Sequence, residues 1–154
     1  VNIAVPNGQV SPALARQAIT VDRVLNPDVA MTFFNLDNPV VGGYTPEKVA
    51  LRRAINLGYD VQQEITLIRR GAMIVGQSQV PPLTSGYDPA FRSEMGEFDR
   101  ARARALLDTF GYLDRDGDGY REMPDGAPLT IEIACETSAL DRAFNEMWKR
   151  MMDP

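Results

Sequence analysis

The sequence predicts an α/β fold in which helices dominate and strands are few. Four stretches carry apolar residues at helical spacing behind residues that commonly begin a helix, whereas only two stretches have the pattern of strands. The composition is that of an ordinary globular protein, with 44% apolar and 24% charged residues in a chain of 154. A chain of this length can bury a substantial core within one domain.

Residues 1–28 predict an irregular segment that precedes the domain, which we place at 29–154. Turn-forming residues recur in this segment, namely Pro6, Asn7-Gly8, Pro12 and Asn26-Pro27. Ser11 could cap a short helix over 12–17. Val29 to Leu36, rich in β-branched and aromatic residues, then predicts a strand that is buried on at least one face.

Two consecutive helices are predicted after this strand. Thr45 supplies a capping hydroxyl and Pro46 suits the first position of a helix. Asp60 caps the second helix, with Gln63 in reach of its backbone, and Gly71 suits the left-handed stop at the end. The apolar stripes are Leu51, Ala54, Ile55 and Gly58 in the first helix and Val61, Ile65 and Ile68 in the second.

The rest of the chain predicts a long loop, a third helix, a strand and a final helix. Residues 72–97 are rich in proline and glycine, and loops this long tend to be functional or to pack on a neighbour. Asp99 caps a helix that runs to about Phe110. Residues 128–134 alternate apolar and polar, which predicts a half-buried strand, and residues 138–152 predict an amphipathic helix.

Two strands separated by some ninety residues do not make a stable sheet of the usual size. We therefore expect partner strands outside this chain, and we expect the chain to be a fragment of a larger fold. Truncation of this kind exposes apolar surface, so self-association of the fragment is expected as well.

Composition argues against catalysis and against nucleic acid. The chain has no histidine, which removes the commonest general base and zinc ligand, and it has only Lys48 and Lys149 as lysines. A net charge of −5 does not suit phosphate recognition. Cys135 has no partner cysteine and is interpreted as a packed thiol. A carboxylate-dependent hydrolase would need two acids facing across one pocket, and the sequence shows no such pair.

An acidic loop over 114–125 is the most conspicuous motif. Asp114, Asp116 and Asp118 with Gly119 match the first half of an EF-hand calcium loop. The match then weakens, because position 12 is an aspartate and the exiting helix is forbidden by Pro124, Gly126 and Pro128. We assign no metal and no cofactor, and interpret the loop as a hydrated glycine-rich turn. The alternative is a calcium-stabilised binding module that uses this loop.

Phe34 and Asn35 are the candidate ligand-binding residues. They stand at the end of the first predicted strand, where an aromatic ring beside an amide could line a ligand cleft. The other interpretation is an ordinary core aromatic followed by a turn-forming asparagine.

The linear order of these elements resembles the peptide-type extracellular solute-binding proteins of ABC importers, the oligopeptide, dipeptide and nickel receptors. The resemblance rests on an ordered series of short motifs between residues 29 and 152. These are Phe34-Asn35, Pro39, Leu51-Arg52-Arg53-Ala54-Ile55, Tyr59-Asp60, Val80-Pro81-Pro82, Gly86-Tyr87-Asp88, Phe98-Asp99, Ala105-Leu106-Leu107 and Gly111-Tyr112.

This resemblance implies a partial second lobe of a type II periplasmic-binding-protein fold. It implies a non-catalytic protein that captures a solute, expected to be a peptide, and delivers it to a membrane permease. It also implies a periplasmic location, or an extracytoplasmic one through a lipoprotein anchor in the intact protein.

Overall fold

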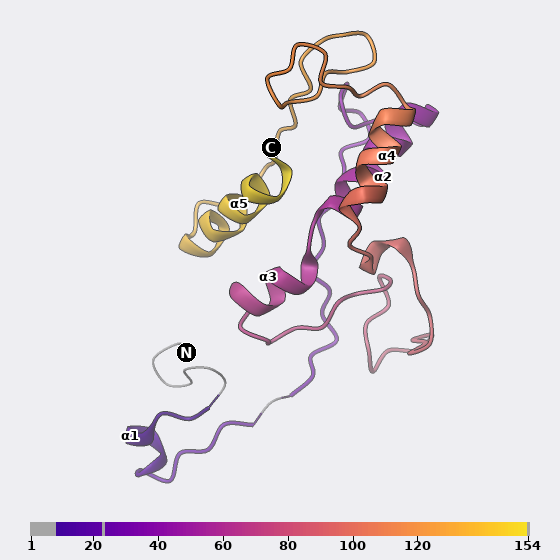
Figure 1. Ribbon diagram of the computed structural model, residues 1–154. Coiled ribbons are helices and arrows are strands. Elements are labelled where there is room, and N and C mark those ends of the chain that lie inside the picture. The colour runs from indigo at the N-terminus through magenta and orange to yellow at the C-terminus, as the bar shows by residue number, and fades with distance from the viewer. Residues whose placement is uncertain (1–8, 23, 154) are drawn as a thin grey trace.

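The computed structural model describes residues 9–22 and 24–153 (Figure 1). Within them the chain forms the helices α1 (Pro12–Ala15), α2 (Pro46–Gly58), α3 (Val61–Leu67), α4 (Arg100–Thr109) and α5 (Ala139–Met152), and a short 3-10 helix, η2 (Glu94–Gly96). The turns expected at Pro6 and Asn7-Gly8 lie outside the described residues.

The long helices begin at the residues that the sequence predicts. Asp60 accepts a hydrogen bond from the Gln63 backbone nitrogen (2.9 Å), Asp99 accepts from that of Arg102, and Ser138 accepts from that of Asp141. Gly71 and Gly111 have φ angles of +71° and +82° after α3 and α4, as expected for helix stops.

Two expected caps are wrong in detail. Thr45 makes no side-chain capping bond, so α2 begins on the preorganised backbone of Pro46. Ser11 likewise makes none, and α1 ends at Ala15 without reaching Gln17.

Neither predicted strand is found. Across the described residues the β contacts reduce to one isolated bridge between Glu122 and Pro128, so the few strands expected over 29–36 and 128–134 are a wrong prediction. A strand satisfies its backbone groups only through a neighbouring strand, and among the described residues of the two stretches only Pro128 has such a pairing, with Glu122. The predicted half-buried face is found only at Leu129, which packs against the core, and it is wrong at Ile131 and Ile133, which are 39% and 45% exposed.

Helix α2 is the centre of the core. One apolar cluster joins its Leu51 and Ile55 to Val41 and Tyr112, and a second joins its Ala54 and Leu57 to α4. Figure 1 shows α2 and α4 side by side. The Asp99 backbone nitrogen also donates to the Leu57 carbonyl (2.9 Å), which ties the start of α4 to the end of α2.

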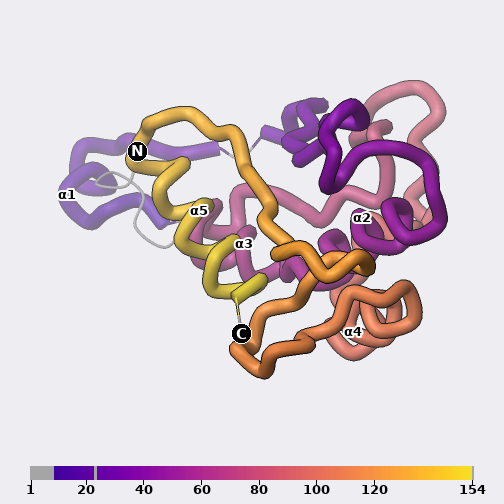
Figure 2. The backbone as a smooth tube through the Cα atoms, turned by 90° about the horizontal axis from the view of Figure 1, so that it is seen from above, coloured from indigo at the N-terminus to yellow at the C-terminus, as the bar shows by residue number. Residues whose placement is uncertain are grey.

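Helix α5 docks at the junction of α2 and α3, as Figure 2 shows from above. Met147 and Met151 are buried there beside Tyr59, and the Trp148 ring stacks on the Tyr59 ring with centroids 4.4 Å apart. Burial, with a hydrogen bond to Glu64, raises the pKa of the Tyr59 hydroxyl. An aromatic stack and two buried methionines therefore hold this last helix.

The molecule exposes much more surface than a compact chain of its mass. Its accessible surface is 10956 Å² for 17.1 kDa, whereas a compact monomer of that mass exposes about 7,800 Å². Residues 24–33 lead away from the other helices towards α1, and nearly all the side chains of residues 9–22 and 24–33 are exposed (Figure 1). No helix of the described residues is long and apolar enough to cross a bilayer.

Candidate functional site

The segment that carries Phe34 and Asn35 runs into a tight turn over 35–43. The Asn35 side-chain oxygen accepts from the Asp37 backbone nitrogen (3.0 Å). The Asn38 side-chain oxygen accepts from the backbone nitrogens of Val40 and Val41 (2.8 and 3.1 Å). Asparagine suits such turns because its short amide replaces a backbone acceptor.

Two basic side chains of α2 fix this turn to the helix. Lys48 donates to the carbonyls of Pro39 and Val40 (2.6 and 2.7 Å). Arg52 donates to the carbonyls of Val41 and Gly43 (2.7 and 2.8 Å). The Leu51-Arg52 part of the motif therefore has a structural role, because it positions the turn that follows the candidate ligand residues.

Close packing inside the turn requires glycine at position 42. A Cβ atom there would lie 2.4 Å from the carbonyl oxygens of both Leu36 and Asn38. The Gly42 nitrogen donates to Asn38 and the Gly43 nitrogen donates to Leu36, so the backbone closes on itself. A turn held from both sides presents its first residues in a fixed orientation.

The two candidate residues differ in their surroundings. Phe34 is half-buried and packs against the cluster of Val41, Leu51 and Tyr112, as the core interpretation predicts. Asn35 is exposed, and its amide nitrogen has no partner among the described residues. The structure thus keeps Asn35 accessible and leaves Phe34 only partly so.

Phe33 belongs to the same aromatic run, but nothing in the sequence favoured it over Phe34 as a ligand contact, and it is 82% exposed. Adjacent residues of an extended segment point to opposite faces, so one of two neighbouring phenylalanines is expected to face outward. The sequence pattern marked both phenylalanines, but it could not show which of the two rings would pack against the core.

The acidic loop places three carboxylates together on the surface. Oxygen atoms of Asp114, Asp116 and Asp118 lie within 4.8 Å of one another, and all three residues are exposed. Asp114 accepts from the backbone nitrogens of Gly117 and Gly119 (2.7 and 3.0 Å). The loop has two further acidic residues, Glu122 and Asp125, and both accept backbone hydrogen bonds within the loop. Glu122 accepts from the Arg115 backbone nitrogen, and Asp125 accepts from the Ala127 backbone nitrogen.

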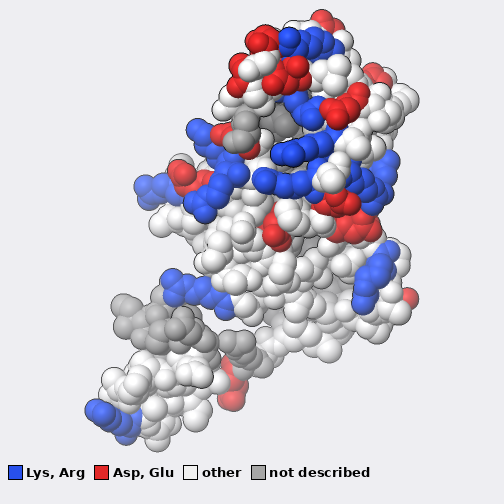
Figure 3. All heavy atoms as spheres, in the orientation of Figure 1, with Lys and Arg blue, Asp and Glu red and all other residues white. Residues whose placement is uncertain are grey.

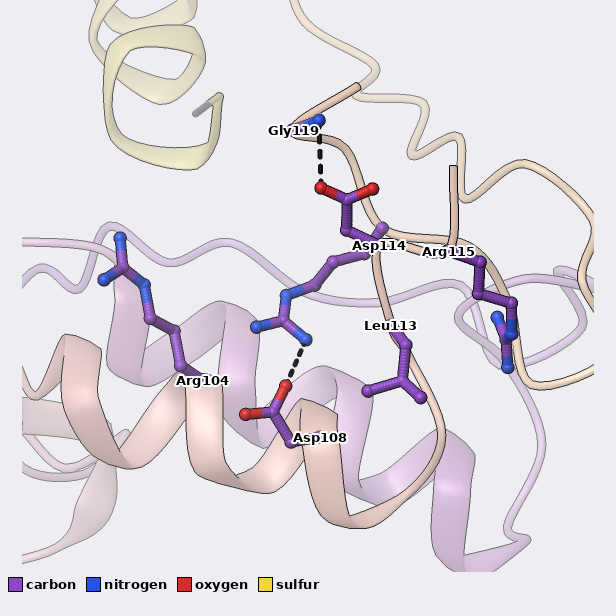
Figure 4. A pocket seen from close by; sticks show the side chains of 7 residues that line it. Arg104, Asp108, Leu113, Asp114, Arg115 and Gly119 are labelled. Carbon is purple, nitrogen blue, oxygen red and sulfur yellow. Dashed lines mark hydrogen bonds and ion pairs between the residues drawn. The ribbon is translucent and has the colours of Figure 1, made fainter. Parts of the chain in front are cut away.

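An open hollow lies beside this loop, against α4 (Figure 4). Asp108 and Asp114 are the two acids that line it. Asp108, however, is paired with Arg121 (2.6 Å), and Asp114 is engaged by the loop nitrogens. Arg104 and Arg115 complete the charged lining of this hollow.

Cys135 is exposed, and its sulfur accepts from the Asn145 side chain (2.9 Å). The interpretation of a packed thiol is therefore wrong, because residues 130–138 run over the surface rather than through a sheet.

Comparison with known proteins identifies the fold around these residues. The family model described as bacterial extracellular solute-binding proteins, family 5 Middle, matches residues 1–153. A crystal structure of a periplasmic oligopeptide-binding protein of an oligopeptide ABC transporter from Thermotoga maritima is similar, with a TM-score of 0.57 and 22% identity. The match covers 74% of this chain and 23% of that one. No curated protein matches.

The similarity to this crystal structure shows the fold. The family match extends over almost the whole chain. The family match confirms the resemblance predicted from the ordered motifs, and the family is one of binding proteins and not of enzymes, as that resemblance implied. On this evidence, the chain belongs to family 5 of the bacterial extracellular solute-binding proteins.

Proposed function

We propose that this chain is part of the second lobe of a receptor that captures peptides outside the cytoplasm for uptake by an ABC importer. The family match and the fold of an oligopeptide-binding protein support this function. The receptor would be periplasmic, or held at the membrane surface by a lipid anchor.

The lobe assignment has independent support in the surface of the molecule. The chain exposes about 3,000 Å² more than a compact monomer of its mass, which favours apolar faces that pack on a neighbour. The exposed side chains of residues 9–22 and 24–28 and a core that begins at Phe34 support the division into an irregular segment over 1–28 and a lobe over 29–154.

In the intact receptor, two lobes would close on the peptide about a hinge. Ligand can drive such closure only by binding the closed state more tightly than the open state. This chain would supply wall and hinge-side structure to one lobe.

We assign ligand contact to Asn35 and Phe34, with Phe33 as an additional candidate. The observation that carries this assignment is the turn over 35–43, which α2 holds through Lys48 and Arg52. A segment fixed in this way loses little entropy when it binds. The Asn35 amide nitrogen can donate to a peptide carbonyl while its oxygen maintains the turn.

Isothermal titration of the intact receptor with peptide pools tests the function. Micromolar or tighter binding of peptides supports it, and the absence of binding across pools of two to six residues contradicts it.

Two substitutions then test the contact residue. Asn35→Asp keeps the acceptor for the Asp37 nitrogen but removes the amide donor, so we expect roughly tenfold weaker peptide binding with an unchanged melting temperature. Asp37→Asn is the matched control, because it alters charge two residues away without touching the amide, and it should bind as the wild type does. Equal affinity for both variants would remove Asn35 from the site.

A further inference from the structure

The face of α5 that docks at the junction of α2 and α3 is built on methionine. Three of the seven methionines of the chain lie in this helix, at positions 147, 151 and 152. Met147 and Met151 are buried, and the Met152 sulfur lies 3.6 Å from the position that a Cβ atom would take at Gly58. The charged side chains of the helix, such as Lys149, stay exposed, and basic groups gather on the left of Figure 3, where Figure 1 draws α5.

Met151 adds a specific polar contact to this face. Its sulfur accepts a hydrogen bond from the Asp60 backbone nitrogen (3.3 Å), at the residue that caps α3. This distance leaves no room for an oxygen atom between the sulfur and the nitrogen. An oxygen bound on that side of the sulfur would displace the helix. One bound on the other side would be a polar group among buried apolar side chains, which also costs stability.

Aromatic rings supply further contacts of α5, and its path to the rest of the chain is exposed. Trp148 stacks on Tyr59, and the Arg69 guanidinium lies over the Phe144 ring, 4.3 Å from its centroid. Among the described residues, the apolar cluster that pairs α2 with α4 includes none from α5. Residues 130–138, which lead to α5, are all exposed. Helix α5 can therefore leave the junction while α2 and α4 stay paired.

Oxidation reaches this face first through Met152. This side chain is 36% exposed, so a hydroperoxide in solution has access to it, whereas Met147 and Met151 become accessible as the end of the helix loosens. The sulfur lone pair attacks one oxygen of hydrogen peroxide, the O–O bond breaks, and the products are a sulfoxide and water. The sulfur is oxidised by two electrons and the peroxide is reduced by two. The polar sulfoxide disrupts the apolar contacts that a thioether makes.

We propose that α5 is a redox-sensitive clamp, which leaves the junction of α2 and α3 when a hydroperoxide oxidises its methionines. Release uncovers Tyr59 and Trp148 and frees the Asp60 nitrogen, and it leaves α2 paired with α4. Reduction of the sulfoxides restores the thioethers, so the clamp closes again. This device goes beyond the proposed solute capture and does not depend on it.

The one tryptophan of the chain lies on the clamp, so its fluorescence reports the position of α5. The 154-residue chain with Cys135→Ser is treated with millimolar hydrogen peroxide, and mass spectrometry locates the sulfoxides. We expect the Trp148 emission to shift to longer wavelength as the ring leaves Tyr59. Hydrogen exchange of the α5 amides should become roughly tenfold faster, and that of the α4 amides should not change.

Two variants separate the clamp from general oxidation. Met147→Leu combined with Met151→Leu and Met152→Leu keeps the apolar volume but cannot form a sulfoxide, so its emission should not change in peroxide. Met31→Leu combined with Met95→Leu is the matched control, because both side chains are exposed (47% and 48%) and lie outside α5. This control should respond to peroxide as the parent does.

Met152→Leu alone is a milder variant that keeps the Met151 contact, and it should respond more slowly than the parent. A response at the parent's rate would contradict the proposal. Sulfoxides at Met151 and Met152 with unchanged emission and exchange would overturn it, and so would α5 methionines that peroxide leaves unoxidised. An equal response of the triple leucine variant, or a lost response of the control, would overturn it as well. No peptide is used, so these outcomes leave the proposed solute capture untouched.

Discussion

Helix α2 and the segment over 129–134 are both rich in apolar residues at the correct period for their predicted structure, but only α2 adopts it. Six residues of α2 are buried, including Leu51 and Leu57, whereas Thr130 to Ala134 are all exposed. A helix satisfies its backbone hydrogen bonds within its own residues, and a strand must find them on a neighbour. The difference shows that a periodic pattern is sufficient for a helix and insufficient for a strand.

Hydrogen exchange should give the largest contrast between these two regions. Amides of α2 become accessible only when the core opens, and amides of 130–134 have no ladder to protect them. We expect protection factors at least about 1,000-fold higher in α2, measured by mass spectrometry of peptic fragments. Comparable protection in both regions would mean that 130–134 pairs in solution, for example with another copy.

Truncation of an aliphatic side chain to alanine should lower the free energy of unfolding much more in α2 than in the segment over 129–134. Leu57→Ala removes a side chain that is 0% exposed and lowers the free energy of unfolding by about 2–5 kcal/mol. Ile133→Ala, at 45% exposure, should change it by less than about 0.5 kcal/mol. Urea denaturation followed by circular dichroism measures both. A loss above 1 kcal/mol at Ile133 would contradict the exposed position of this segment.

The ion pairs at the border of α2 should have a smaller, pH-dependent effect. The hydrogen bond from Arg53 lowers the pKa of the Glu94 carboxyl, so the stabilisation is present above the ordinary value of 4.5 and is lost as the pH falls through the folded-state pKa. Glu94→Gln should cost less than about 1 kcal/mol at pH 7, because both side chains are partly exposed.

The difference between Glu94→Gln and the wild type should shrink as the pH is lowered below 4.5 in the same denaturation series. Glu97→Gln is the control, since this carboxylate is 50% exposed and pairs with Arg102 alone. A destabilisation by Glu94→Gln that is as large at pH 3 as at pH 7 would exclude the ion pair as its cause.

Calcium should have the smallest effect. Asp114, Asp116 and Asp118 offer one ligand oxygen each, so they supply three of the six to eight oxygens that calcium takes. Asp125 accepts from the Ala127 backbone nitrogen instead of joining them. Melting midpoints with calcium and with chelator should therefore be equal. A higher midpoint in calcium that is lost in Asp116→Asn would favour the calcium-stabilised alternative, because a ligand of the native state must raise the midpoint.

The candidate site was predictable in outline. The motif around Phe34 and Asn35 marked the segment, and the asparagine was expected at a turn. The contacts of Lys48 and Arg52 to the carbonyls of 39–43 were not predictable, because they depend on how the turn lies on α2. Which of Phe33 and Phe34 faces the core was likewise decided by packing.

The sequence by itself determined where the long helices begin and end, and which family the chain belongs to. Caps such as Asp60, Asp99 and Ser138 act on backbone groups two or three residues away, so their effect is local and readable. Tertiary structure decided whether the apolar segments over 29–36 and 128–134 became strands, and which apolar residues were left in solvent. Those outcomes depend on the presence of a neighbouring chain segment, and periodicity carries no information about that neighbour.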